Sequence, residues 1–279
     1  MKDWLLRFIP QKFRTGHPIV HVIRFVGVIG QVTPLRQGLT LRAVEDTLKR
    51  AFAKKGIAAV AIQINSPGGS AVQSALIQTR VRALAAEHKV PVLVFCEDVA
   101  ASGGYWLACA GDEIYADASS VVGSIGVISA GFGFVDAIAK LGIERRVHTS
   151  GENKSILDPF QPEKAEDVDR LVSLQRDIHE DFKSLVRTRR AGRLKGDEAE
   201  LFSGAFWSGR KALDFGLIDG LGHMHEILQR RFGDKVILRR IEKPQGWGLR
   251  RLGLAAADDV AGGLAGALEE RSMWSRFGL

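Results

Sequence analysis

The chain has 279 residues, and its 39 Lys and Arg against 32 Asp and Glu give a formal net charge of +7. This length suffices for a substantial core without disulfides or metals, and Cys96 and Cys109 have no Cys or His neighbours at metal-ligand spacing. We therefore expect no metal and no other cofactor. The basic residues form clusters without a nucleic-acid-binding motif, which favours solvated faces or an anionic membrane surface over a nucleic-acid partner.

The opening segment, residues 1–18, interleaves apolar side chains such as Trp4 and Phe8 with basic ones. This is the pattern of an amphipathic helix at a membrane surface, and it fits equally an arm that packs on its own domain or on a neighbouring subunit. Charges and Pro10 interrupt the segment too early for a secretory signal, and the longest uncharged stretch, 118–135, is too rich in Gly and Ser for a transmembrane helix. The sequence therefore predicts a cytoplasmic protein, or one peripheral on the inner face of the cell membrane.

The first half of the chain alternates predicted strands and helices. Residues 19–29 predict a strand or hairpin, and residues 40–56 a helix with Thr40 as N-cap and Gly56 as C-terminal stop. The following elements are strand 58–64, helix 70–89, strand 90–96, short helix 102–111, and strands 113–117 and 121–129. Because the strands are almost wholly apolar, we expect a parallel sheet with right-handed crossovers on both faces and with the functional site beyond the carboxyl ends of the strands.

The second half is more helical. Its predicted elements are helix 134–142, strand 144–150, a polar loop at 151–160, a long helix at 162–190, a short helix from Ser208 to Phe215, a helix ending at Phe232, and strand 235–241. Beyond Pro244 the composition turns to Gly, Ala and Arg, with a loosely apolar helix at 255–270. We therefore expect an arm at 1–18, a main domain at 19–243 and a flexible or helical extension at 244–279.

Two turns at the ends of neighbouring predicted strands could carry chemistry. Ser102 follows a strand, begins a helix and is succeeded by Gly103 and Gly104, which is the setting that a nucleophilic serine needs. Gly68 and Gly69 stand in the other turn, where N–H groups ahead of a helix can hold a negatively charged oxygen. Taken alone, each has an ordinary interpretation, as a helix N-cap serine and as a tight turn. Side by side, they strengthen one another.

A serine nucleophile needs a general base, and two residues compete for that role. His148 ends a predicted strand beside the polar loop and is the histidine with the most suitable position. Lys154 lies in that loop, followed by apolar Ile156 and Leu157, and a lysine desolvated by apolar neighbours can accept a proton near neutrality. Ser/Lys pairs are a known variant of the serine triad. These residues by themselves leave the choice open.

Five motifs between about residues 19 and 241 together resemble those of the signal peptide peptidase A (protease IV) family of Ser/Lys peptidases. They are NSPGG at 65–69, ASGGYWLA at 101–108, GSIGVI at 123–128, GENKSILDPF at 151–160 and FWSGRKALDFGLIDGLG at 206–222. The resemblance implies an α/β fold like that of crotonases and the Clp protease, a spiral of strand-strand-helix repeats that assembles into homo-oligomers. It also implies that neighbouring subunits share one site, with Ser102 and Lys154 well separated in a single chain.

The resemblance assigns roles residue by residue. It implies that Ser102 is the nucleophile and Lys154 its base, that Gly68 and Gly69 contribute to the oxyanion hole, and that Ser124 supports the lysine. It implies further that substrate binds at Gly103, Ile125, Gly126 and Val127, where strand 125–128 pairs with an extended peptide. Asn65 replaces the usual Asp of the family, which puts a charge-dependent role there in doubt.

The implied activity is hydrolysis of peptide bonds through an acyl-enzyme, with signal peptides or membrane-associated peptide fragments as substrates. An alternative is a crotonase-like acyl-CoA enzyme, which needs carboxylates near the glycine turns, where Glu97 and Asp98 are the nearest acids. A second alternative is a catalytically silent, membrane-associated scaffold of the same fold. The presence of Ser102, Lys154 and both glycines argues against that loss of chemistry.

Overall fold

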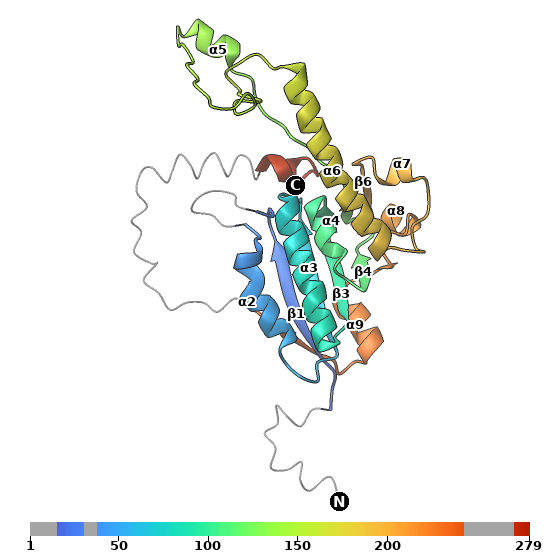
Figure 1. The fold of residues 1–279 in the computed structure, drawn as a ribbon. Helices are drawn as coiled ribbons and strands as arrows, with labels where there is room; N and C mark the ends of the chain where they lie inside the picture. The colour runs from blue at the N-terminus through green and yellow to red at the C-terminus, as the bar shows by residue number, and fades with distance from the viewer. Residues whose placement is uncertain (1–15, 31–37, 243–270) are drawn as a thin grey trace, which may run out of the picture.

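The computed structural model describes residues 16–30, 38–242 and 271–279. The amphipathic helix predicted near the N-terminus and the helix predicted at 255–270 lie outside these residues. At the centre is an eight-stranded sheet (Figure 1). Its strands are β1 (Ile19–Val26), β2 (Ala59–Ser66), β3 (Val92–Ala101), β4 (Glu113–Ala116), β5 (Val121–Gly123), β6 (Phe206–Ser208), β7 (Gly220–Leu221) and β8 (Ile237–Arg240).

The sheet has the order β6-β5-β3-β2-β1-β8, and β4 lies between β3 and β7. Its pairs are parallel except for β5 with β6, which confirms the predicted parallel sheet. On the side away from β2, strand β3 has two neighbours, because residues 93–96 pair with β4 and residues 99–101 pair with β5. It continues past the predicted end at Cys96, since the side chains of Glu97 and Asp98 find partners on β1 and β2.

The helices cover both faces of the sheet. They are α2 (Leu41–Phe52), α3 (Ala71–His88), α4 (Gly103–Ala108), α5 (Val135–Lys140), α6 (Ala165–Arg189), α7 (Glu198–Leu201), α8 (Gly209–Asp214) and α9 (Met224–Phe232). The hydroxyl of Thr40 accepts a hydrogen bond from Ala43 N–H, which confirms the predicted cap of α2. The helix nevertheless ends at Phe52, before the predicted stop at Gly56.

Two apolar clusters hold the layers together. The larger cluster joins α2, α3 and α4 to one face of the sheet, through side chains such as Leu48, Phe52 and Ile77. The smaller one joins α9 to the other face, where Ile227 and Leu228 pack against the central strands. Burial on both faces explains why the strands are almost wholly apolar. Within the described ranges, no helix has the length and apolar character needed to cross a bilayer.

Residues 129–164, which we call the projecting arm, include α5 and stand away from the sheet (Figure 1). The start of α6 stands away from the sheet with them. Only Phe182 and Val186, near the end of α6, are buried in that helix. The strand predicted at 144–150 is wrong, because this part of the arm has no sheet edge to pair with and contains no strand. On the arm, Phe132 is 81% and Leu141 is 74% exposed.

The strand predicted at 121–129 is also wrong beyond Gly123. Ser124 adopts φ +53° and donates its N–H to the carbonyl of Ala205 (2.7 Å). This turn takes the chain out of the sheet, and the segment that follows toward the projecting arm has no strand pairing. Residues 125–128 therefore do not form the predicted strand in the single chain.

Candidate active site

Ser102 stands at the junction of β3 and α4. Its backbone has φ +52° and ψ −121°, a sparsely populated conformation that costs of the order of 1–3 kcal/mol for a residue with a side chain. The Ser102 N–H donates to the carbonyl of Gly123 in β5 (2.8 Å), and the Ser102 carbonyl accepts from Trp106 N–H (3.0 Å). These bonds hold a sharp turn between strand and helix. The Ser102 hydroxyl does not cap the described α4, so it is available to a substrate.

The glycine turn lies directly against Ser102. A Cβ on Gly68 would stand 2.8 Å from the Cβ of Ser102, so glycine is required for this close approach. The Gly68 N–H already donates to Ser66 Oγ (3.2 Å). Among the described residues, the N–H groups of Gly69 and of Gly103, in the first turn of α4, have no acceptor. Of the two glycines predicted for the oxyanion hole, Gly69 thus has the free donor.

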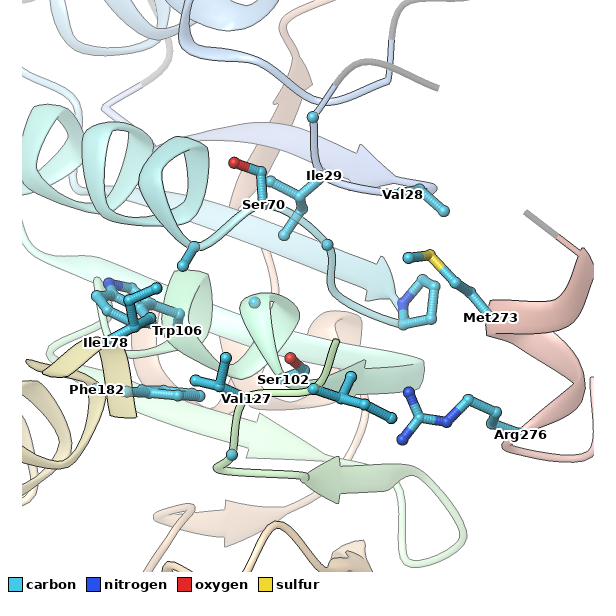
Figure 2. A pocket seen from close by; sticks show the side chains of 17 residues that line it. Val28, Ile29, Ser70, Ser102, Trp106, Val127, Ile178, Phe182, Met273 and Arg276 are labelled. Atoms are coloured by element: carbon cyan, nitrogen blue, oxygen red, sulfur yellow. The ribbon is translucent and has the colours of Figure 1, made fainter. Parts of the chain in front are cut away.

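A cavity of about 410 Å³ opens beside these groups. Ser102, Gly69 and Gly103 border it, and its other walls are mainly apolar. Figure 2 shows Trp106, Ile178 and Phe182 gathered at one end and Val28 and Ile29 on the opposite wall from Ser102. Trp106 stacks on Phe182 with 4.6 Å between ring centroids, which joins α6 to α4. The cavity therefore offers apolar surface next to a polar reacting centre.

Ser124 borders a second cavity of about 220 Å³, which also reaches Ser102. The Ser124 side chain is otherwise buried, and its position is fixed by the bond from its N–H to Ala205. The residues that line this space include Ser102 and Ser124 together.

The segment after Ser124 connects the two cavities. Gly126 and Val127 line both of them, whereas the side chain of Ile125 is buried in the core. The Ile125 carbonyl lies 3.0 Å from Nε2 of His179 on α6, so this histidine supports the segment predicted to bind substrate. No local sequence pattern indicates this contact, because the two residues are 54 positions apart.

The structure does not bring Lys154 to Ser102 within one chain. Lys154 is exposed on the projecting arm, which extends away from α4 (Figure 1). It does not line either cavity beside Ser102. The competing candidate His148 is also exposed on this arm and is equally absent from both linings. Neither candidate base therefore completes the site in the single chain.

Asn65 ties the end of β2 to β3. Its amide donates to Asp98 (2.6 Å) and its carbonyl oxygen accepts from Val99 N–H (3.2 Å). An aspartate at position 65 would instead face the Asp98 carboxylate at this distance and lose the donor. Glu97 is bound by Arg24 and Gln63. Both acids line a cavity that does not include Ser102.

The family profile and several of the relatives found by sequence carry the names of peptidases, whereas one relative carries the name of an antiporter. The profile of peptidase family S49 matches residues 85–235. The Na(+)/H(+) antiporter NhaA of Brucella melitensis is 51% identical over 287 aligned residues, which cover 99% of this chain and 39% of that protein. The chloroplastic serine protease SPPA of Arabidopsis thaliana is 32% identical over 76% of this chain and 32% of its own length.

Two further matches have lower identity. Protease 4 of Haemophilus influenzae is 30% identical over 66% of this chain and 29% of its own length. A solved mutant of the 1510-N membrane-bound stomatin-specific protease covers 82% of this chain and 100% of its own, at 15% identity and a TM-score of 0.49. This chain thus spans at most 39% of the length of the three relatives compared by sequence.

The family profile covers just over half of the chain, residues 85–235 of 279. Relatives named as serine protease SPPA and Protease 4 confirm the resemblance to the signal peptide peptidase A family. The mixed α/β sheet agrees with the Clp-protease-like fold class that this resemblance implies. The chain therefore belongs to peptidase family S49.

Proposed function

We propose that this chain is a serine endopeptidase with Ser102 as its nucleophile. The observation that carries the proposal is the strained turn that presents Ser102 to a cavity beside the unpaired N–H groups of Gly69 and Gly103. Strain at a turn between strand and helix is typical of a serine held exposed for attack. Two N–H donors at such a point stabilise the negative oxygen that develops on the attacked carbonyl.

The reaction proceeds through an acyl-enzyme. The amine of Lys154 takes the proton of Ser102 as Oγ attacks the peptide carbonyl, and the oxyanion binds to the N–H groups of Gly69 and Gly103. The protonated lysine then gives its proton to the leaving amine, and the C–N bond breaks. Lys154 next activates a water molecule that hydrolyses the ester and restores the Ser102 hydroxyl. Ser124, which borders the same space as Ser102, orients the lysine.

The lysine of each site comes from a neighbouring copy of the chain. Two observations support this arrangement: Lys154 stands on the projecting arm, and the second cavity leaves space beside Ser102 and Ser124. The arm also exposes apolar side chains, among them Phe132 and Leu141. Exposed apolar patches of this kind mark protein–protein contacts. Packing of the arm onto a second copy would cover these side chains and place Lys154 at the interface between the two copies.

The substrate is an extended peptide with apolar side chains, such as a signal peptide or a membrane-associated fragment. The apolar walls of the main cavity, with Trp106 and Phe182 at one end, support this choice. The segment Ile125–Val127 would pair with the main chain of the peptide, with Gly126 and Val127 facing the cavities. Gly103 lies next to the carbonyl that is attacked.

Complementation between two inactive variants tests the shared site. We expect Ser102→Ala and Lys154→Ala each to abolish hydrolysis of casein or of a fluorogenic apolar peptide. When the two variants are unfolded and reassembled together in equal amounts, a ring in which neighbours share a site regains about one quarter of the wild-type activity. This fraction arises because half of the chains supply an intact serine and half supply an intact lysine.

The matched control is Lys140→Ala, because Lys140 is an exposed lysine on the same arm. It should leave hydrolysis close to the wild-type rate. Full activity of the Ser102→Ala variant would show that Ser102 is not the nucleophile. If each variant is inactive alone and the mixed oligomer assembles but is also inactive, Ser102 and Lys154 of one site do not come from neighbouring copies.

The acyl-CoA alternative has less support from the described residues. Glu97 and Asp98 are engaged by Arg24, Gln63 and Asn65, and both acids line a cavity other than that of Ser102. Tight binding of coenzyme A to the purified protein would favour this alternative. Labelling by a fluorophosphonate that disappears in Ser102→Ala would argue against both this enzyme and a silent scaffold.

We also propose peripheral contact with the anionic inner face of the cell membrane. The net charge of +7 favours such a surface. A relative in Brucella melitensis, of which this chain covers 39%, is named as a Na(+)/H(+) antiporter. Release of the native protein from membranes by high salt is the expected result, and its absence from the membrane fraction at low salt would contradict the contact.

A further inference from the structure

Residues 271–279 lie against the proposed active site. They begin as a helix, and Figure 2 shows Met273 and Arg276 pointing from this helix toward the cavity that holds Ser102. Arg276 also lines the second cavity, which Ser102 and Ser124 share. This C-terminal segment, residues 271–279, therefore forms part of the wall at both places where peptide and base are proposed to bind.

The segment is anchored beside the site by its last side chains. Phe277 meets Phe206 of β6 edge-on, with 5.0 Å between ring centroids. Phe277 and Leu279 also line a third cavity, which includes Ser119 and Ser120 but not Ser102. Phe206 remains 46% and Leu279 57% exposed. The contacts that Phe277 and Leu279 make with described residues are thus partly solvated, which suits a segment that can leave and return.

Arg276 adds a positive charge to the otherwise mainly apolar cavity beside Ser102. It is the single charged residue among the described residues that line the cavity of Ser102. In that lining it stands with Gly126, Val127 and Ile128, the segment proposed to pair with an extended peptide. A peptide lying along residues 126–128 would therefore meet the side chains of Met273 and Arg276. The C-terminal segment and the substrate compete for one space.

We infer that residues 271–279 act as an intramolecular ligand of the peptide groove, which an incoming peptide must displace. The inference rests on the proposed function of Ser102 and adds its regulation. Only molecules from which the segment has left can bind peptide. The apparent dissociation constant for peptide therefore equals the intrinsic constant divided by the fraction of molecules with an open groove. Weaker docking should therefore tighten peptide binding, and permanent docking should prevent it.

The test is a reversible lock on the full chain. Ser119→Cys and Leu279→Cys place two thiols on one cavity that does not include Ser102, and a bis-methanethiosulfonate reagent can join them. The native Cys96 is buried but lines this same cavity, so both substitutions are made in a Cys96→Ala background. Cys109 is buried and burial raises the pKa of its thiol to about 12, so it should not react. The probe is a fluorescein-labelled peptide of the sequence RSMWSRFGL, followed by fluorescence anisotropy.

We expect the joined chain to lose probe binding and peptide hydrolysis by tenfold or more, and a reductant to restore both. Either Cys substitution alone should react without loss. Phe277→Ala should tighten probe binding and raise kcat/KM by about tenfold, whereas Arg271→Ala, an exposed change on the same helix, should change neither. Failure of the two thiols to join, or a joined chain that binds the probe normally, overturns the inference. Because probe binding needs no chemistry, a chain that binds and locks as expected but hydrolyses no peptide would contradict only the proposed activity.

Discussion

Replacing Gly68 by alanine should disable the site by a clash whose size follows from the structure. The added Cβ would stand 2.8 Å from Ser102 Cβ, 2.9 Å from Gly103 N and 3.0 Å from Ala101 O. None of these atoms belongs to a flexible side-chain end, so the turn that carries Ser102, the proposed nucleophile, must move. An overpacked contact of this kind costs about 1–3 kcal/mol. The positive φ of +108° at Gly68 adds about 1–2 kcal/mol for a residue with a Cβ.

Gly56→Ala is the matched control. Gly56 has φ +78° and no heavy atom within 4 Å of an added Cβ, so this variant carries the backbone cost of about 1–2 kcal/mol without a clash. We expect Gly68→Ala to lose about 2–5 kcal/mol in the free energy of unfolding. Peptide hydrolysis should fall about 100- to 1000-fold in Gly68→Ala, because the Gly103 N–H moves from the oxyanion position.

The assay is urea unfolding at one fixed protein concentration, followed by circular dichroism, together with peptide hydrolysis under native conditions. The difference between the two variants isolates the contact between the glycine turn and Ser102. Equal stability of Gly68→Ala and Gly56→Ala, with hydrolysis retained in both, would refute the reasoning. It would mean that the two turns do not approach as closely as described.

Two further predictions concern buried charge. Arg190, which is 1% exposed, donates two hydrogen bonds to Asp219 (2.7 and 3.0 Å), so Arg190→Met should cost about 3–5 kcal/mol. Arg193→Met should cost less than about 1 kcal/mol, because Arg193 is 45% exposed and 3.4 Å from the same carboxylate; equal urea midpoints would contradict this. Burial, aided by the charges of Arg239 and Lys54, lowers the pKa of His21 from 6.5. The unfolded chain therefore takes up a proton first, and stability should fall as pH decreases below about 6.5. His21→Gln should flatten this slope in unfolding curves between pH 5 and about 7, with His225→Gln as an exposed control that keeps it.

The parallel sheet and the turn that holds Ser102 could be predicted because they depend on local patterns. Apolar strands alternate with helices, and Ser102 with its two glycines follows directly after a strand. The sequence predicts the end of β3 at Cys96, because Glu97 and Asp98 indicate a turn when read alone. In the structure they lie at an irregularity of the ladder between β2 and β3, and their side chains bond to Gln63 and Asn65 of β2. Strands β6 and β7 span three and two residues, which is too short for an apolar period to be visible.

The surroundings of the candidate site could not be predicted because they depend on contacts between distant parts of the chain. Ser124 is held by Ala205, and Ile125 by His179. The approach of Met273 and Arg276 likewise follows from no local pattern. The place of Lys154 is a different case: motif resemblance predicted its separation from Ser102, but residue types alone did not choose between Lys154 and His148.

The positive φ at Ser102 also separates the demands of folding from those of chemistry. A residue without a Cβ adopts φ +52° with little penalty, so stability alone would favour glycine at this position. Serine there makes the fold less stable than it could be, in exchange for a hydroxyl at the mouth of the cavity. Ser102→Gly should thus gain thermal stability as it loses the proposed nucleophile, a trade-off common at sites shaped for reactivity.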